Sequence, residues 1–166
     1  MIEVFRPILL PVGFVLRLIY QVLFSWWLNP VFDRWIRNGF AQDIKQAIPY
    51  LFDLHGGRVV PDPKPNTNDE NMDYLCVAST FLIFKFRRWH RENYGVQIAP
   101  TFSPTEFYDV LDALRLADPA ANTKLPMLDV SWRFWGQLLE PRFHLLEEVF
   151  DAEHFPDTKA RLASLQ

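Results

Sequence analysis

The most extended hydrophobic pattern of the chain lies near its N-terminus. Residues 8–28 read ILLPVGFVLRLIYQVLFSWWL and are almost entirely apolar. At ~1.5 Å of rise per residue, a helix of about 21 residues matches the ~30 Å hydrocarbon core of a bilayer. We therefore predict a long apolar helix here, and we take residues 1–29 as an N-terminal segment and residues 30–166 as a single domain.

The polar residues of this segment are regularly spaced. Arg17, Gln21 and Ser25 follow one another at every fourth position, so on a helix they form one polar ridge. A central arginine costs about 2.5–3.5 kcal/mol on the membrane insertion scale, which the surrounding apolar residues offset. Three interpretations remain open: a membrane-spanning anchor, a helix lying in the membrane interface, and a core helix of a soluble protein.

The flanks of the segment favour a membrane boundary. Two tryptophans end the apolar run, and Arg34, Arg37 and Lys45 follow it, whereas Arg6 stands alone on the N-terminal side. By the positive-inside rule, a spanning helix then leaves the C-terminal domain in the cytoplasm. The single cysteine, Cys76, cannot form an internal disulfide and agrees with a reducing compartment. The alternative location is a soluble cytoplasmic one.

The middle of the chain carries strand patterns. Residues 58–60 (RVV) suggest a short strand, and residues 74–79 (YLCVAS) suggest a buried one. Residues 81–90 (FLIFKFRRWH) alternate apolar and polar side chains at period two, and a turn leads back into residues 94–100, as in a hairpin. We predict a short antiparallel meander of three to four strands.

Helix patterns follow the strands. Ser103, Pro104 and Glu106 have the spacing of a helix cap, first-turn proline and capping-box glutamate, so a helix is predicted to begin at Ser103. Further helices are predicted for residues 129–139, up to Phe150 after a break at Glu140-Pro141, and from about Pro156. The fold class is therefore α+β: the long N-terminal apolar helix, the meander, and then C-terminal helices.

Composition excludes several function classes. The formal net charge is −3, with 17 basic and 20 acidic residues, so the chain as a whole does not favour nucleic acid. No glycine-rich phosphate loop or nucleophile elbow is present. His144, Glu147 and Glu148 share a helix face but lack metalloprotease spacing, so we interpret them as a solvated face, or equally as a surface for a basic protein partner. We expect no metal site and no cofactor.

The strongest local candidate for binding is the basic end of the predicted hairpin. Lys85, Arg87 and Trp89 would project from one face of the strand, with Arg88 and Arg91 nearby. Basic groups interleaved with an aromatic ring suit anionic headgroups or nucleic acid phosphates and bases. A solvated hairpin end is the plainer explanation, and lipid headgroups are the favoured anion if the first helix is membrane-bound.

The region after residue 39 resembles the small bacterial proteins that neutralise polymorphic toxins, in size, acidity and helix, meander, helix order. This resemblance implies a non-enzymatic protein-interaction domain, which the N-terminal helix would hold at the inner face of a bacterial membrane. Two alternatives are a soluble enzyme with a dispersed site around Cys76, His90 and the 144–154 carboxylates, and a soluble nucleic-acid-binding domain that uses the basic hairpin.

Overall fold

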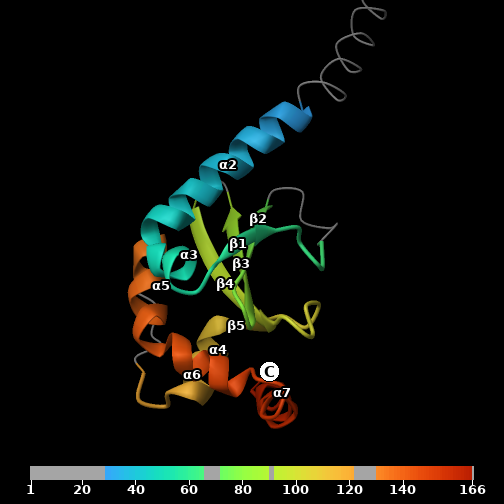
Figure 1. Ribbon diagram of the computed structural model, residues 1–166, viewed down its shortest axis with the longest axis vertical. Coiled ribbons are helices and arrows are strands. Elements are labelled where there is room, and N and C mark those ends of the chain that lie inside the picture. The colour runs from blue at the N-terminus through green and yellow to red at the C-terminus, as the bar shows by residue number, and fades with distance from the viewer. Residues whose placement is uncertain (1–28, 66–71, 90–91, 122–129, 166) are drawn as a thin grey trace, which may run out of the picture. The chain divides into compact units, whose positions relative to one another are not determined.

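The computed structural model describes residues 29–65, 72–89, 92–121 and 130–165 (Figure 1). The chain divides into two compact units, Met1–Gly39 and Phe40–Gln166. Helix α2 comprises Asn29–Ala47, so the sequence boundary between the two units falls within its residues. The predicted apolar helix of residues 8–28, with Arg17, Gln21 and Ser25, lies outside the described residues. Among the residues described, no helix combines the length and the apolar character needed to cross a membrane.

The centre of the second unit is an antiparallel sheet of five strands, in the order β1-β2-β3-β4-β5. The α+β class predicted for this region is confirmed, and the sheet has five strands where three to four were expected. Strand β5 has only two residues, too few to give a recognisable alternation. The strands are β1 Arg58–Val60, β2 Met72–Ala78, β3 Leu82–Trp89, β4 Glu92–Pro100 and β5 Tyr108–Asp109.

Helices frame the sheet. Proline interrupts them at two points, because it cannot donate the backbone hydrogen bond and clashes with the preceding turn. Pro49 begins a new helix after α2, and Pro141 lies in a 3-10 turn between two helices. The elements are α3 Pro49–Asp53, α4 Val110–Ala117, α5 Trp132–Leu139, η2 Glu140–Arg142, α6 Phe143–Val149 and α7 Phe155–Ala163.

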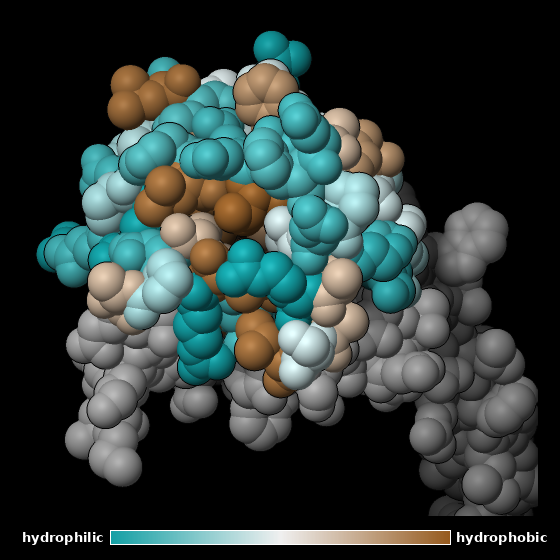
Figure 2. Space-filling view, turned by 90° about the horizontal axis from the view of Figure 1, so that it is seen from below, coloured by the Kyte–Doolittle hydropathy of each residue, from teal (hydrophilic) through white to brown (hydrophobic). Residues whose placement is uncertain are grey.

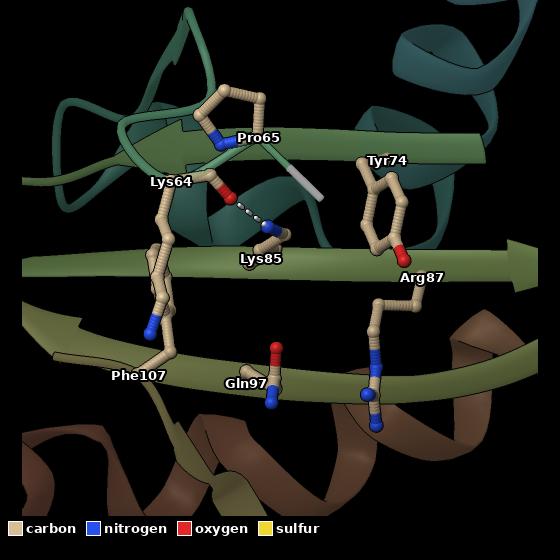
Figure 3. A pocket seen from close by; sticks show the side chains of 7 residues that line it. All are labelled: Lys64, Pro65, Tyr74, Lys85, Arg87, Gln97 and Phe107. Atoms are coloured by element: carbon tan, nitrogen blue, oxygen red, sulfur yellow. Dashed lines mark hydrogen bonds between the residues drawn. The ribbon is translucent and has the colours of Figure 1, made fainter. Parts of the chain in front are cut away.

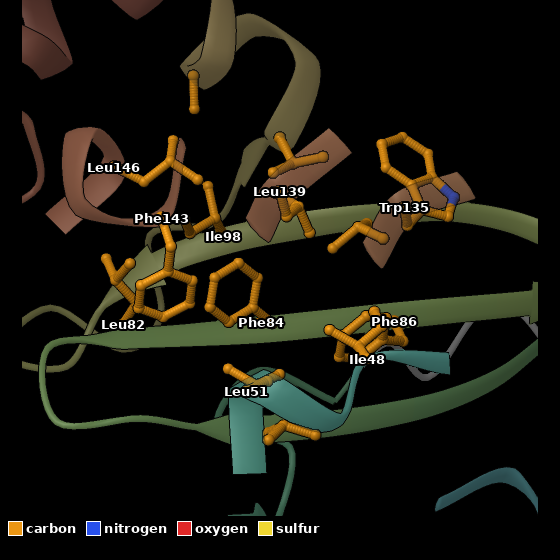
Figure 4. Close-up of a cluster of buried hydrophobic side chains, with 14 of the residues drawn as sticks. Ile48, Leu51, Leu82, Phe84, Phe86, Ile98, Trp135, Leu139, Phe143 and Leu146 are labelled. Atoms are coloured by element: carbon orange, nitrogen blue, oxygen red, sulfur yellow. The ribbon is translucent and has the colours of Figure 1, made fainter. Parts of the chain in front are cut away.

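One face of the sheet, which we call the helix face, forms the hydrophobic core (Figure 4). In β3 the alternate residues Leu82, Phe84 and Phe86 point to this face and are at most 1% exposed. The Phe84 ring lies 5.6 Å from that of Phe143 in α6, and the Phe86 ring lies 5.6 Å from that of Trp132 in α5. The period-two pattern of β3 thus places its aromatic residues against the helices.

The predicted helix start at Ser103 is wrong. Helix α4 begins at Val110, and its cap is Asp109, whose Oδ1 accepts a hydrogen bond of 2.9 Å from the amide of Leu111. Ser103 lies instead in a turn, where its carbonyl accepts from the amide of Glu106 at 3.2 Å. Serine and proline favour tight turns as well as helix starts, and here the pairing of β5 with β4 decides between the two.

A glycine pair ends α3 and directs the chain into β1. Gly56 has a φ of 64°, a left-handed conformation that other residues rarely adopt. The amide of Gly57 donates to the carbonyl of Leu51 at 2.8 Å. A Cβ atom at Gly57 would lie 2.6 Å from that same oxygen, so a larger residue at this position would force the backbone between α3 and β1 to shift.

Candidate ligand pocket on the loop face of the sheet

The face of the sheet opposite the helices, which we call the loop face, holds a pocket of about 280 Å³ (Figure 3). Strands β2, β3 and β4 supply its floor, and two connecting segments supply its walls. The lining residues are Lys64, Pro65, Tyr74, Lys85, Arg87, Gln97 and Phe107. Its size lies just below the ~300–1,000 Å³ typical of small-molecule sites, so it suits a small ligand.

Lys85 is the most buried charged group of the pocket. The residue is only 4% exposed, because it occupies a central position of β3. Its Nζ lies 2.6 Å from Oδ2 of Asp62 and donates to the carbonyl of Lys64 at 2.8 Å. The rings of Tyr74 and Phe107 lie 4.6 and 5.3 Å from the same nitrogen. The buried ammonium is thus neutralised by a carboxylate and flanked by two aromatic rings, as a buried cation requires.

Asp62 fixes the segment that follows β1. Its Oδ1 accepts a hydrogen bond of 3.0 Å from the amide of Lys64, which is the geometry of an Asx turn, while Oδ2 pairs with Lys85. The backbone of residues 62–64 is therefore tied to the middle of the sheet at two points. The side chain of Lys64 remains exposed at the entrance of the pocket.

Arg87 forms the opposite wall from Lys64 in Figure 3, where Gln97 lies between them on β4. Arg87 pairs with Gly95 across the β3–β4 ladder. A Cβ atom at Gly95 would lie 3.3 Å from Nη2 of Arg87, so the glycine leaves room for the guanidinium to rest over β4. Two cations and one amide thereby face the same small space.

Cys76 lies on the loop face beside the Lys85 pair, but its thiol is not set up as a nucleophile. Burial, followed by the nearby carboxylate of Asp62, raises the pKa of the Cys76 thiol to about 12, and the ammonium of Lys85 only partly opposes this. The thiolate is the reactive form of cysteine, so reactivity at neutral pH would require a lowered pKa. Cys76 is a buried packing residue in this structure.

The basic residues predicted as one cluster are distributed over both faces of the sheet. Lys85 and Arg87 line the pocket, as alternation predicts. Arg88 follows a register irregularity in the β3–β4 pairing and contacts other elements. Its guanidinium pairs with Asp43 at 3.4 Å and Asp73 at 3.2 Å, and its Cζ lies 4.2 Å from the centre of the Phe40 ring. Trp89 ends β3, and Arg91, like His90, falls outside the described residues.

The acidic face predicted as a partner surface belongs to α6. His144 and Glu148 are exposed and Glu147 is half-buried, while Phe143 and Leu146 of the same helix pack into the core. Helix α6 covers the helix face of the sheet, so these three residues and Cys76 lie on opposite sides of it. The structure does not bring the acidic surface and the pocket together.

Several residues of the pocket were missed by the sequence interpretation. Tyr74 and Gln97 lie on the same face as Lys85, directly across from Arg87 and Lys85 in the strand register. Period-two alternation could have found both once the strand pairing was known. Asp62, Lys64 and Phe107 come from connecting segments, and no pattern within those segments marks them as neighbours of Lys85.

Apolar side chains are also present on the surface. Figure 2, which views the molecule from the lower end of Figure 1, shows a central hydrophobic patch with hydrophilic side chains around it. Two aromatic residues, Phe81 and Phe102, are exposed. They lie at the same end of the sheet, since the amide of Thr101, the residue before Phe102, donates to the carbonyl of Phe81 at 2.9 Å. Exposed aromatic side chains of this kind are enriched in protein–protein contacts.

Within the described parts of the chain, no group of three or more histidine, cysteine, aspartate or glutamate residues is arranged to hold a metal ion. Comparison of the sequence with models of known families, of the sequence with curated proteins, and of the fold with solved structures found no match in any of the three. The site is therefore interpreted from its own chemistry.

Proposed function

We propose that this protein is a non-enzymatic protein-interaction domain, held at the inner face of a bacterial membrane by its N-terminal segment. The observation that carries the proposal is the separation of the groups an enzyme would need. A dispersed active site would bring Cys76 together with the acidic residues of α6, and these lie on opposite sides of the sheet. The raised pKa of the Cys76 thiol also removes the most reactive candidate nucleophile.

The acidic surface of α6 supports a protein partner of basic character. His144 and Glu148 are exposed, and Glu140 and Glu153 lie exposed before and after the helix. Complementary charge raises the rate of encounter with a basic partner and excludes acidic ones. A toxin-neutralising role, as implied by the size, acidity and element order of the domain, would use such a surface.

The membrane location rests on the sequence of residues 8–28 and on the basic residues Arg34, Arg37 and Lys45 that follow it. The test is to express the full chain in a bacterium and to separate membrane from soluble protein. We expect the chain in the membrane fraction, resistant to carbonate extraction. Arg17→Leu should strengthen retention, because it removes the main cost of insertion. Recovery of the full chain as a soluble monomer without detergent would contradict the membrane location.

The partner surface is tested separately by site-specific crosslinking. A photoreactive amino acid is placed at position 148 of α6, and at position 161 of α7 as a matched exposed control. We expect a discrete protein adduct from position 148 that disappears when Glu147 and His144 are replaced by lysine, and no such adduct from position 161. Adducts of equal yield from both positions, or adducts that survive the lysine substitutions, would contradict a specific acidic interface.

A further inference from the structure

We propose that residues 61–65, which we call the strap, open and close over the loop face as one stiff unit, latched by the ion pair between Asp62 and Lys85. The strap follows β1 directly and supplies the wall of the pocket formed by Lys64 and Pro65. In the closed state this wall is complete, and in the open state the pocket is joined to solvent. The inference goes beyond the proposed function and does not depend on it, because it concerns access to the loop face.

The sequence of the strap makes it stiff. It reads PDPKP, so a proline stands at every second position, at 61, 63 and 65. Each proline fixes its own φ at about −65° and disfavours the helical conformation in the residue before it. All five residues of the strap are therefore restricted by a proline ring, and a proline-rich segment of this kind moves as a semi-rigid unit.

The backbone and the apolar atoms of the strap contribute little to its attachment. The ladder between β1 and β2 ends at Val60, so the strap lies outside it. Its prolines have no amide to donate, and the amide of Lys64 donates to Oδ1 of Asp62, within the strap itself. None of the five residues is fully buried, and Pro61, Lys64 and Pro65 are exposed. A segment with few buried contacts opens at a lower free energy than the core.

Lys85 is the latch, because it joins the strap to the centre of the sheet. Its Nζ lies 2.6 Å from Oδ2 of Asp62 and donates to the carbonyl of Lys64 at 2.8 Å, a hydrogen bond drawn in Figure 3. Lys85 is only 4% exposed, and both of these partners come from the strap. Opening gives the ammonium water in place of the two partners. The closed and open states therefore differ mainly in one charged interaction, and not in the packing of the core.

Cys76 can report on the strap, since it is the single cysteine of the chain. In the strand register Cys76 stands between Val60 and Lys85, so the pair of Asp62 and Lys85 lies beside its thiol. The residue is 2% exposed, and burial together with the Asp62 carboxylate raises the pKa of the thiol to about 12. Opening of the strap removes the carboxylate and admits water, whereas Lys85 stays on the sheet. The thiol should therefore be alkylated only from the open state.

The test measures alkylation of Cys76 by iodoacetamide in the full chain in a mild detergent, with mass spectrometry as the readout. The urea concentration is raised in steps below the unfolding transition. Opening of the strap alone exposes little surface, so its rate hardly depends on urea, whereas global unfolding exposes the core and depends on urea steeply. We expect a nearly constant rate at low urea, followed by a steep rise. A rate that follows global unfolding from zero urea onwards would overturn the inference.

Substitutions assign the rate at low urea to the latch. Asp62→Asn removes the charge of the strap and should raise this rate by about tenfold or more, in keeping with the loss of a charge-assisted interaction. Lys85→Met should raise it as well, when each rate is divided by that of the same variant unfolded in urea. Asp53→Asn is the matched control, since Asp53 is exposed at the end of α3, and it should leave the rate unchanged.

A core variant separates opening of the strap from a general loss of stability. Ile44→Val removes one methylene group from a fully buried position of α2 and so destabilises the whole fold. It should move the steep rise to lower urea and leave the rate at low urea as in the wild type. A rate at low urea raised as much by Ile44→Val as by Asp62→Asn, or raised by neither Asp62→Asn nor Lys85→Met, would show that the ion pair is not a latch.

Discussion

The two faces of the sheet are built on different principles, although the same strands form both. On the helix face the alternate residues of β3 are Leu82, Phe84 and Phe86, which pack against helices with no polar group among them. On the loop face the intervening residues Lys85 and Arg87 are charged, and the buried Lys85 is held by a carboxylate, a carbonyl and aromatic rings. Burial of apolar area stabilises the first face, whereas the second depends on specific partners.

This difference means that the two faces respond to substitution in different ways. A truncated side chain on the helix face leaves a cavity, whose cost grows with the volume that is removed. A truncated partner on the loop face leaves a buried charge, whose cost is relieved when the charge is removed as well. The experiments below separate these two responses.

The largest effect is expected on the helix face. Phe84 is 1% exposed, and Phe84→Ala should lower the free energy of unfolding by ~3–5 kcal/mol, because its ring packs between the sheet and α6. The measurement is urea unfolding of the full chain in detergent, followed by circular dichroism. Phe102→Ala is the control, since Phe102 is 53% exposed, and it should change stability by less than ~0.5 kcal/mol. Equal costs at the two positions would contradict the assignment of the core.

The next effect sharpens the contrast on the loop face. Asp62→Ala should lower the free energy of unfolding by ~3 kcal/mol in the same assay, because the buried ammonium of Lys85 then has no carboxylate partner. Adding Lys85→Met should recover most of this loss, since the charge is then absent and the side chain still fills the space. Lys159→Ala breaks an exposed ion pair with Glu106 and should matter far less. A double variant less stable than Asp62→Ala alone would show that the pair is not the source of the cost.

The smallest effect concerns pH. Because the pKa of the Cys76 thiol rises from 9.0 to about 12, the folded protein keeps this proton above pH 9 while the unfolded chain loses it. The unfolded state then binds fewer protons, so the stability contributed by the buried neutral thiol is complete below pH 9 and is lost as the pH rises towards 12. The stability difference between wild type and Cys76→Ala should shrink over this range. In the native protein, iodoacetamide should modify Cys76 far more slowly than after unfolding, and equal rates would contradict its burial.

Much of the fold could be predicted from the sequence, because the features that fix it are local. The alternation of residues 81–90 identifies β3 and its apolar face, and Pro49 and Pro141 mark breaks between helices regardless of the surroundings. The start of α4 could not be predicted in the same way. Ser103 and Asp109 are both competent caps, and the choice between them depends on pairing with β4, which is a tertiary contact.

The pocket could be predicted only in part, for the same reason. Lys85 and Arg87 were identified as facing one side of their strand, and both line it. The burial of Lys85 depends on Asp62, 23 positions earlier in an irregular segment, and only the return of that segment over the sheet reveals the pair. A lysine between two phenylalanines has the same local pattern whether it is solvated or buried with a carboxylate.

The edges of the sheet have a consequence for how the molecule behaves in a crowded solution. The outermost strands, β1 and β5, have three and two residues, and Pro61 follows β1 directly while α4 follows β5. Unpaired amides and carbonyls on a long edge would template another strand, and short edges ended by a proline or a helix leave few such groups. At β1 and β5 themselves the sheet is therefore poorly suited to extension by a neighbouring chain.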